Sequence, residues 1–369
     1  MKMTLTVHKL TVRAVAAPMP LPLQTASGAV STALLVLIDL ETSAGITGRA
    51  YLQSYTKASL QPIVDLVKNM GEMIEGDALA PFEIEAKLRQ KFKLLGVHNI
   101  VLFAIAGIDM AVWDALAQGA NLPLVTMLGG KPKPIRAYNS KGLGIMPVAK
   151  LGKEAKALLK EGFHAVKLRL GRADPNEDLA AVRAVKKAIG EEPTLMVDYN
   201  QALSVNDAIL RGRMLDRLMD ETGGSLHWIE EPTRADDFAG NARIAAALKT
   251  PVQIGENFMG PEQMAPALAA CACDYVMPDA QRIGGVTGWM RAAALAQGQG
   301  VEMSSHLFPE ISVHLLGVTP TAHWLEYVDW AAPILAEPLS AKDGFIAIPD
   351  VPGSGIRWDE KAVAKYAIG

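Results

Sequence analysis

The sequence predicts an α/β barrel preceded by an α+β unit, and three observations carry this prediction. Apolar runs that each end in a polar residue recur eight times after residue 131. Segments of helical character fill most of the gaps between these runs, whereas residues 1–130 lack the rhythm. Parallel strands that alternate with helices close into a (β/α)8 TIM barrel, in which the active site lies where the strands end. We therefore expect residues 131–330 to form the barrel.

Residues 1–130 are predicted to form the α+β unit. The expected strands are Thr4–Val15 and Ala33–Leu40, and the expected helices are Leu60–Met73, Pro81–Lys93 and Asn99–Gln118. The last helix is apolar nearly all round, which predicts that it is buried. Its apolar stretch is too short to span a bilayer and contains two aspartates, so we expect no membrane partner.

The barrel strands are placed by the eight apolar runs. They are expected to end near Ser140, Lys167, Asp198, Glu230, Glu256, Asp279, His306 and Glu326. Pro147–Glu161 and Glu177–Ile189 are predicted helices, and each is followed by a glycine suited to a helix stop. Residues 331–369 are rich in proline and glycine, and we expect them to return to the first domain, because eight units already close a barrel.

Composition narrows the class of protein. Half of the 369 residues are hydrophobic, which is enough for a large core, and the net charge of −3 gives no electrostatic footprint for nucleic acid or an anionic membrane. Cys271 and Cys273 are the only cysteines and are too close in sequence for a useful bridge. Together with a first segment that lacks a signal-peptide core, this indicates a cytoplasmic location.

Three carboxylates follow three successive apolar runs, and they predict a metal site. Asp198, Glu230 and Glu256 have the spacing of consecutive strand–helix units. Strand ends of a barrel converge on one mouth, where three hard oxygen ligands suit Mg²⁺ and leave positions for substrate and water. The alternative is that each is an unrelated loop carboxylate, which is common for one residue but not for three in register.

Two further strand ends predict a general base. Asp279 and His306 end consecutive strands, so the carboxylate is expected to accept a hydrogen bond from the imidazole and fix its tautomer. The last strand offers Glu326, which could donate a hydrogen bond if its site keeps it protonated.

Lys167 and Arg169 lie two residues apart on the second strand, which places both cations on the same face. One interpretation is that they act in catalysis. The other is that they pair with Asp198 and Glu230 as a structural network.

The acidic triad, Asp279, His306 and Glu326 lie in motifs that resemble the enolase superfamily, in the mandelate racemase subgroup, along nearly the whole chain. The motifs are Ala106–Asp114, Val197–Gln201, Trp228–Thr233, Gly255–Asn257, Pro278–Asp279, Ile283–Trp289, Ser304–Phe308 and Thr319–Glu326. The resemblance implies a modified (β/α)8-type TIM barrel with an α+β capping domain, a Mg²⁺ cofactor and a 2-hydroxycarboxylate substrate. It also implies a homo-oligomer, since octamers are common in the family.

The resemblance also implies a role for each candidate residue. Asp198, Glu230 and Glu256 would bind Mg²⁺, and Asp279 with His306 would form the general-base dyad that removes the α-proton. Lys167 would bind the substrate carboxylate and Glu326 would hydrogen-bond the enolate, while Asn200 and Ser140 would lie close to the substrate. A histidine or lysine base that acts with Mg²⁺ on a carbon acid is the established chemistry of this superfamily.

One departure from the family pattern concerns the reaction. Arg169 stands where racemases that resemble this chain have a second lysine base, and arginine stays protonated, so it is a poor base and a good anion clamp. Arg282, in place of an expected lysine, is a milder change near the dyad. A site with one base favours dehydration of an acid sugar or a related hydroxy acid to a 2-keto acid over racemisation.

An opposing feature keeps racemisation or epimerisation open. Residues 22–30 match the substrate-capping loop by position, and Leu23 and Val30 are apolar, which suits an aromatic or alkyl 2-hydroxy acid that has no β-hydroxyl to lose. A third hypothesis is a catalytically silent protein that binds the metal and the acid.

Overall fold

The first part of the chain forms a three-stranded antiparallel sheet covered by helices. In the computed structural model, which describes residues 5–368, the strands are β1 (Val7–Thr25), β2 (Gly28–Thr42) and β3 (Thr47–Ser54), in the order β1-β2-β3. The helices are α1 (Lys57–Ile74), α2 (Pro81–Lys91), α3 (Ile100–Gly119) and α4 (Leu124–Met127). We call residues 5–129 the cap.

Two sequence expectations for the cap were wrong. Residues 22–30 were expected to be a loop, but Leu23 pairs with Val30 and the segment is the tip of a long β1–β2 hairpin. Strand β3 was not predicted at all, because its sequence, Thr47–Ser54, carries a glycine and polar residues and does not show a strict alternation.

Helix α3 is the core of the cap, as its composition predicts. Nearly every residue from Val101 to Ala117 is buried. Close packing on β3 depends on Gly48, where a Cβ atom would collide with the carbonyl oxygen of Ala111. Within residues 5–368, α3 is the one helix long and apolar enough to cross a membrane, and it is buried inside the protein.

The second part of the chain is a closed barrel of eight parallel strands, which confirms the predicted fold class. The strands are β4 (Pro134–Asn139), β5 (Ala165–Arg169), β6 (Thr194–Asp198), β7 (Ile229–Glu230), β8 (Val252–Ile254), β9 (Tyr275–Val276), β10 (Glu302–Met303) and β11 (Leu325–Tyr327). Neighbours in sequence pair from β4 to β10, and β11 pairs with β4. The bridge between Met303 and Ala322 brings β10 beside the start of β11.

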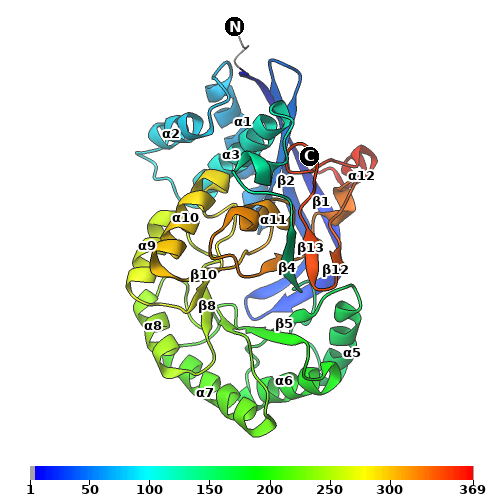
Figure 1. Ribbon diagram of the computed structural model, residues 1–369, viewed down its shortest axis with the longest axis vertical. Helices are drawn as coiled ribbons and strands as arrows, with labels where there is room; N and C mark the ends of the chain where they lie inside the picture. The colour runs from blue at the N-terminus through cyan, green and yellow to red at the C-terminus, as the bar shows by residue number, and fades with distance from the viewer. Residues whose placement is uncertain (1–4, 369) are drawn as a thin grey trace.

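Helices surround the barrel, as the arc from α5 to α9 shows in Figure 1. They are α5 (Val148–Leu159), α6 (Pro175–Ile189), α7 (Val205–Thr222), α8 (Phe238–Ala247), α9 (Pro261–Ala269), α10 (Gly285–Gln299) and α11 (Pro309–Val318). The predicted helix stop at Gly190 is the residue after α6, with φ of 82°.

The last segment contacts both parts of the molecule. After a short 3-10 helix (Ala332–Ile334), β12 (Ala341–Lys342) and β13 (Phe345–Ala347) form a hairpin that pairs with β4, while α12 (Glu360–Tyr366) lies against β1 (Figure 1). The division of the chain at residues 130 and 330 remains a prediction.

Alternation along the barrel strands decides what faces the interior. A separate apolar cluster fills the middle of the barrel and consists of Tyr138, Ala165, Met196, Trp228 and Trp324, with Tyr275 beside it. Two residues further along five of these strands lie Ser140, Lys167, Asp198, Glu230 and Glu326. Because side chains two positions apart on a strand face the same side, the apolar layer inside the barrel is followed directly by a polar layer at the carboxyl ends of the strands.

Candidate active site

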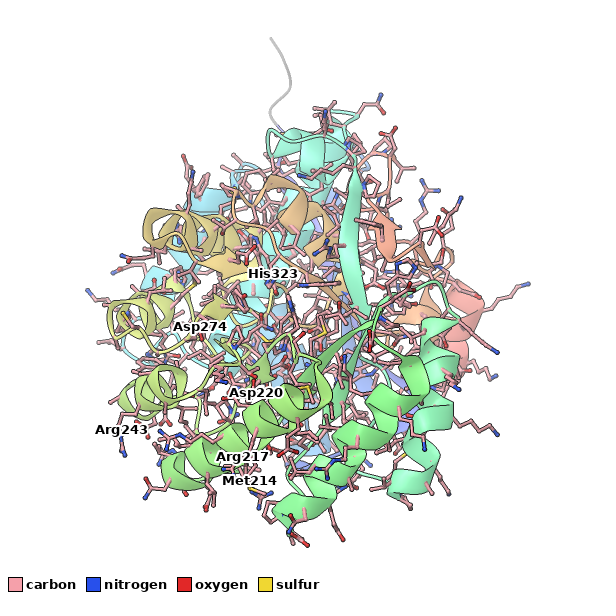
Figure 2. All side chains as sticks on the ribbon, turned by 60° about the horizontal axis from the view of Figure 1, so that its bottom comes forward. Met214, Arg217, Asp220, Arg243, Asp274 and His323 are labelled. Carbon is pink, nitrogen blue, oxygen red and sulfur yellow. The ribbon has the colours of Figure 1, made fainter. Side chains whose placement is uncertain are left out.

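The carboxyl ends of the strands and the tip of the β1–β2 hairpin enclose a cavity of about 330 Å³. The predicted residues that line it are Leu23, Val30, Lys167, Arg169, Asp198, Asn200, Glu256, His306 and Glu326. Figure 2 shows His323 inside the ring of helices, whereas Met214, Arg217 and Asp220 lie on α7 and Arg243 on α8, away from the interior. The cap and the barrel together thus bring Leu23 and Glu326, more than 300 residues apart in sequence, to one cavity.

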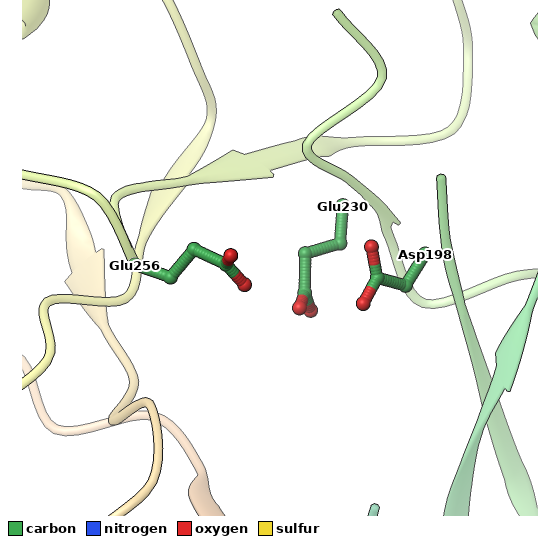
Figure 3. A group of neighbouring side chains, drawn as sticks. All are labelled: Asp198, Glu230 and Glu256. Carbon is green, nitrogen blue, oxygen red and sulfur yellow. The ribbon is translucent and has the colours of Figure 1, made fainter. Parts of the chain in front are cut away.

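The three predicted metal ligands meet at one point. Each of Asp198, Glu230 and Glu256 offers an oxygen, and these atoms lie within 4.8 Å of one another. Figure 3 shows the carboxylates of Asp198 and Glu256 turned toward Glu230, which lies between them. Asp198 and Glu230 are fully buried. Three carboxylates this close repel one another unless a cation lies among them, and an all-oxygen set fits Mg²⁺.

The pKa of Glu230 shows how much negative charge this group concentrates. Burial, together with the charges of Asp198, Glu326 and Glu256, raises that pKa to about 8 against the opposing effect of Lys167. A divalent cation would relieve this repulsion. The residues present therefore fit the ion.

Lys167 is a buried cation in contact with two members of the triad. Its Nζ atom contacts Glu230 and lies 3.4 Å from Asp198 Oδ2 and 2.8 Å from Glu326 Oε1. Burial acts to lower the pKa of Lys167, but Glu230, Glu326 and Asp198 outweigh it and raise the pKa above its usual value. The ammonium group stays charged and links the metal ligands to Glu326.

His306 and Asp279 form the hydrogen-bonded pair that their positions in the sequence predict. His306 Nδ1 lies 2.8 Å from Asp279 Oδ2. The other carboxylate oxygen, Oδ1, accepts hydrogen bonds from the backbone N–H groups of Gln281 (2.8 Å) and Arg282 (3.0 Å). An ionised Asp279 that accepts from Nδ1–H leaves Nε2 of His306 to accept a proton on the cavity side.

The charges around His306 favour its protonated form. Burial acts to lower its pKa, but Glu256, Glu326 and Asp279 raise it to about 9. Nε2 lies 3.5 Å from Glu256 Oε2 and 3.9 Å from Glu326 Oε2. The imidazole of His306 is therefore in direct electrostatic contact with one of the candidate metal ligands.

Glu326 lies beside His306 and accepts several hydrogen bonds. Ser140 Oγ donates to Oε1 (2.6 Å), and the Leu307 N–H donates to Oε2 (2.9 Å). Burial acts to raise the pKa of Glu326, but Lys167 and His306 outweigh it and hold the pKa below its usual range. These contacts favour the ionised carboxylate, against the protonated form expected from the sequence. Its hydrogen bond to the enolate stays a prediction.

Arg169 is fixed by oxygens of the loop after β4. Its Nη1 donates to the carbonyl oxygens of Ser140 (2.6 Å) and Gly142 (2.8 Å), and its Nη2 donates to Ser140 Oγ (2.8 Å). Among the described residues, its Nε has no hydrogen-bond partner. Of the two cations proposed for a structural network, Lys167 contacts Asp198 and Glu230, whereas Arg169 bonds to this loop.

The hairpin tip and Asn200 close the cavity on the cap side. Ser27 Oγ donates to the carbonyl oxygen of Asn200 (2.8 Å), and Asn200 Nδ2 donates to Asp198 Oδ2 (2.9 Å). Within residues 5–368, the side-chain oxygen of Asn200 has no partner. Leu23 and Val30 line the cavity from the paired ends of β1 and β2.

Outside the segment 22–30, four cavity residues were not predicted: Tyr55, Leu307, Val328 and Trp330. Leu307 and Val328 follow His306 and Glu326 within two residues. The positions of the strand ends were therefore enough to predict them. Tyr55 directly follows β3, so it could not be found while that strand was missed.

Glu231 is fully buried, yet it is not among the residues that line the cavity, as the alternation of strand side chains predicts. Its carboxylate accepts from the Gly255 N–H (3.1 Å), behind Glu256. Burial, with the nearby charge of Glu256, raises its pKa well above the usual range.

Comparison with known proteins agrees with this geometry. Residues 8–129 match the mandelate racemase/muconate lactonizing enzyme N-terminal domain, and residues 150–362 match the family described as enolase C-terminal domain-like. The chain is 32% identical to the L-talarate/galactarate dehydratase of Salmonella typhimurium over 89% of this chain and 81% of that protein.

Two solved structures cover essentially the whole chain. An enolase from the alphaproteobacterium BAL199 with bound Mg is 46% identical, with a TM-score of 0.95 over 99% of this chain and all of that chain. A Bradyrhizobium enolase complexed with magnesium and mandelic acid is 40% identical, with a TM-score of 0.93 over the full length of both chains. Together with the acidic triad, these structures show that Mg²⁺ is the cofactor.

Proposed function

This chain belongs to the mandelate racemase/muconate lactonizing enzyme family of the enolase superfamily, and from that premise we propose that it dehydrates a 2-hydroxycarboxylate that also carries a β-hydroxyl, an acid sugar or a related hydroxy acid, to a 2-keto acid. The observation that carries the choice of dehydration is the position of Arg169. Its guanidinium donates three hydrogen bonds to oxygens of Ser140 and Gly142, which stabilise the charged form. A base on that side of the substrate is therefore missing, and His306 is left to act alone.

The first step is removal of the α-proton by His306. Its Nε2 accepts the proton while Nδ1–H remains bonded to Asp279 Oδ2 at 2.8 Å, so the carboxylate stabilises the imidazolium that forms. Asp198, Glu230 and Glu256 would hold Mg²⁺, which would supply positive charge that offsets the second negative charge on the reacting carboxylate. Lys167, buried and charged beside the triad, stabilises the same developing charge.

The second step is loss of the β-hydroxyl. The bond between the β-carbon and this oxygen breaks, and the proton that His306 took from the α-carbon leaves with the hydroxyl as water. The enol that remains takes up a proton at the β-carbon and loses the proton of its hydroxyl group, which gives the 2-keto acid, so atoms and charge balance. Proton removal and delivery from one residue require the α-hydrogen and the leaving hydroxyl to lie on the same face of the substrate.

Two unpartnered polar atoms support binding of a hydroxylated acid at this cavity. Arg169 Nε and the side-chain oxygen of Asn200 have no partner within residues 5–368, and both residues line the cavity. Buried polar atoms without a partner are costly, so a bound ligand that pairs with them gains affinity. Arg169 suits a carboxylate and the amide oxygen of Asn200 suits a hydroxyl.

A second candidate, racemisation or epimerisation of a 2-hydroxy acid, is favoured by the apolar side of the cavity. Leu23, Val30, Leu307 and Val328 line it, and the Bradyrhizobium relative was crystallised with mandelic acid. An aromatic 2-hydroxy acid of that kind has no β-hydroxyl to eliminate. This reaction would need Arg169 or a neighbour to return the proton on the second face.

Proton NMR in D₂O with Mg²⁺ tests the proposal, with a set of 2-hydroxy acids from mandelate to the C4–C6 sugar acids. Loss of the α-proton signal together with a rising 2-keto product supports dehydration and identifies the acid. Deuterium at the α-carbon with an unchanged skeleton supports racemisation or epimerisation instead. Mg²⁺ and acid binding without exchange for any acid would favour the silent binding protein.

The Arg169→Lys variant separates the first two reactions. If only the second base is missing, this variant gains racemisation, because an amine can lose its proton where a guanidinium cannot. Assembly into a homo-oligomer, an octamer by family resemblance, stays a prediction that light scattering of the purified protein tests.

A further inference from the structure

We propose that the edge strand β3 of the cap positions the His306–Asp279 dyad, and that Gln281 is the positioning residue that ties the dyad to it. This inference rests on the proposed function of the dyad and concerns a residue outside the motifs noted in the sequence. It explains how the loop that carries Asp279 and the loop that carries His306 are held in place relative to each other.

Within residues 5–368, strand β3 has a free edge, because it pairs only with β2 in the sheet order β1-β2-β3. A free edge exposes backbone N–H and C=O groups that need partners when buried. The N–H of Gln53 donates to Gln281 Oε1 (2.7 Å), and Gln281 Nε2 donates to the carbonyl oxygen of Gln53 (3.3 Å). The side-chain amide of Gln281 thus occupies the place of a neighbouring strand residue.

The same residue holds Asp279. The backbone N–H of Gln281 donates to Asp279 Oδ1 (2.8 Å), while Asp279 Oδ2 lies 2.8 Å from His306 Nδ1. Gln281 and Asp279 are both fully buried, so neither bond competes with solvent. A continuous chain of hydrogen bonds therefore runs from the cap strand through Gln281 and Asp279 to the imidazole.

A second contact from β3 holds the loop on the other side of the dyad. Tyr51, two residues before Gln53, donates from its hydroxyl to Glu310 Oε2 (2.5 Å) and packs against Phe308 with 5.1 Å between ring centroids. Leu307 and Phe308 both have a positive φ, 47° and 48°, which costs free energy for residues other than glycine. Contacts on β3 thus stabilise strained backbone directly after His306.

The chain supplies a matched control for this role. Gln118 on α3 also donates its side-chain amide to β3, to the carbonyl oxygen of Thr47 (3.0 Å), and to Asp114 Oδ2 (2.7 Å). Thr47 begins β3, whereas Gln53 lies near its end. Gln118 therefore bonds to the same strand at the end that is away from the dyad. Loss of either amide removes two hydrogen bonds to this region.

The test compares Gln281→Met with Gln118→Met in the full-length, Mg²⁺-loaded enzyme. Both variants are expected to unfold at a lower temperature. Only Gln281→Met is expected to lower kcat, by about 10- to 100-fold, because a displacement on the order of 1 Å at a catalytic group has that effect. KM should stay within roughly threefold, since the residue does not line the cavity.

A crystal structure of each Mg²⁺-loaded variant gives a readout that needs no substrate. We expect the loop at residues 279–282 to shift and the His306–Asp279 hydrogen bond to lengthen in Gln281→Met, and both to stay in place in Gln118→Met. An unmoved loop, or an equal kcat in the two variants, overturns the proposal. A shifted loop in an enzyme that turns over none of the acids would support the positioning role and contradict the proposed function.

If Gln281→Met does not fold, Gln281→Glu keeps the test decisive. A glutamate still accepts from the Gln53 N–H but no longer donates to the Gln53 carbonyl oxygen. We expect a smaller loss of kcat of the same kind, and a kcat equal to that of the unmodified enzyme would count against the proposal.

Discussion

The two ends of the barrel interior differ in charge: one holds concentrated negative charge and the other is neutral. At the carboxyl ends of the strands, carboxylates lie within 4.8 Å of one another, and Arg169 and Asn200 keep polar atoms without partners among the described residues. At the amino ends, Trp324 Nε1 donates to His227 Nε2 (2.8 Å), which lies 3.1 Å from His323 Nε2. Because the indole can only donate, His227 Nε2 must accept, and His323 Nε2 must be the donor in the second bond.

This difference separates binding from stability. The histidine cluster is neutral and its hydrogen bonds are made within the protein, so it contributes to folding without a ligand. The opposite end holds concentrated negative charge that a cation must offset, and such sites cost stability in the absence of the ion. Substitutions at the two ends should therefore change different measurements.

His306→Asn should have the largest effect on catalysis. Asparagine keeps a polar side chain but cannot take a proton, so kcat should fall by about 10⁴-fold, the upper range for a general base. The unfolding temperature should change little. A variant that keeps most of its turnover in the α-proton exchange assay would contradict the assignment of the base.

Glu256→Gln should weaken metal binding at the same end. This carboxylate is the more exposed of the three and lies beside His306. Loss of an outer-shell partner alone typically weakens a site by about 10- to 100-fold, so removal of a ligand should weaken Mg²⁺ binding by more than about 100-fold in calorimetry. The metal-free variant should be at least as stable as the unmodified protein, because less like charge is brought together.

Trp324→Phe should have the opposite pattern, with lower stability and unchanged Mg²⁺ affinity. It removes the donor to His227 Nε2 and should reduce the free energy of unfolding by about 1–3 kcal/mol, the range for a lost buried hydrogen bond. Chemical denaturation measures this. A change in Mg²⁺ affinity as large as that of Glu256→Gln would contradict the claim that the histidine end affects stability and not metal binding.

The smallest change should be a pH dependence of stability from the same histidines. Burial, then the nearby Arg136, lowers the pKa of His227 to about 4, and burial with His227 and Arg136 lowers that of His323 to about 3. Both histidines bind a proton more readily in the unfolded chain, where the pKa is about 6.5. The stability they contribute is therefore complete above pH 6.5 and is lost as pH falls toward 4.

Thermal unfolding between pH 7 and 4 measures this dependence. His323→Gln should make the curve shallower, since one of the two groups no longer titrates. Trp289→Phe is the control. Like Trp324, Trp289 donates a buried hydrogen bond from Nε1, to Thr319 Oγ1 (3.0 Å), but it lies outside the histidine cluster, so its loss should leave the pH dependence unchanged. An equally steep curve in His323→Gln would show that other groups cause the acid sensitivity.

Much of the site followed from the order of residues along the chain. Consecutive strand ends are neighbours in a barrel, so Asp279 beside His306 and the meeting of Asp198 with Glu230 were predictable once eight runs were found. The limits of this rule are visible at β5, which ends at Arg169 rather than Lys167, and at His306, which lies three residues beyond β10. Neither shift moved a side chain out of the cavity.

The cap was less predictable, and for a physical reason. Strand β3 owes its strand conformation to pairing with β2 and packing on α3, which are contacts between residues far apart in sequence. The same holds for the β1–β2 hairpin tip, where Leu23 pairs with Val30 beneath a cavity built by the barrel. Local propensity does not contain these contacts.

Strand periodicity and chain order were enough to predict the barrel, the acidic triad and the dyad, because they set which side chains face the interior and which strand ends are neighbours. Folding in three dimensions set the partners of Arg169, the link from Lys167 to both the triad and Glu326, and the contact of Gln281 with the edge of β3. Those partners are backbone oxygens and side chains brought close by folding, and only their positions in space decide which charges are stabilised.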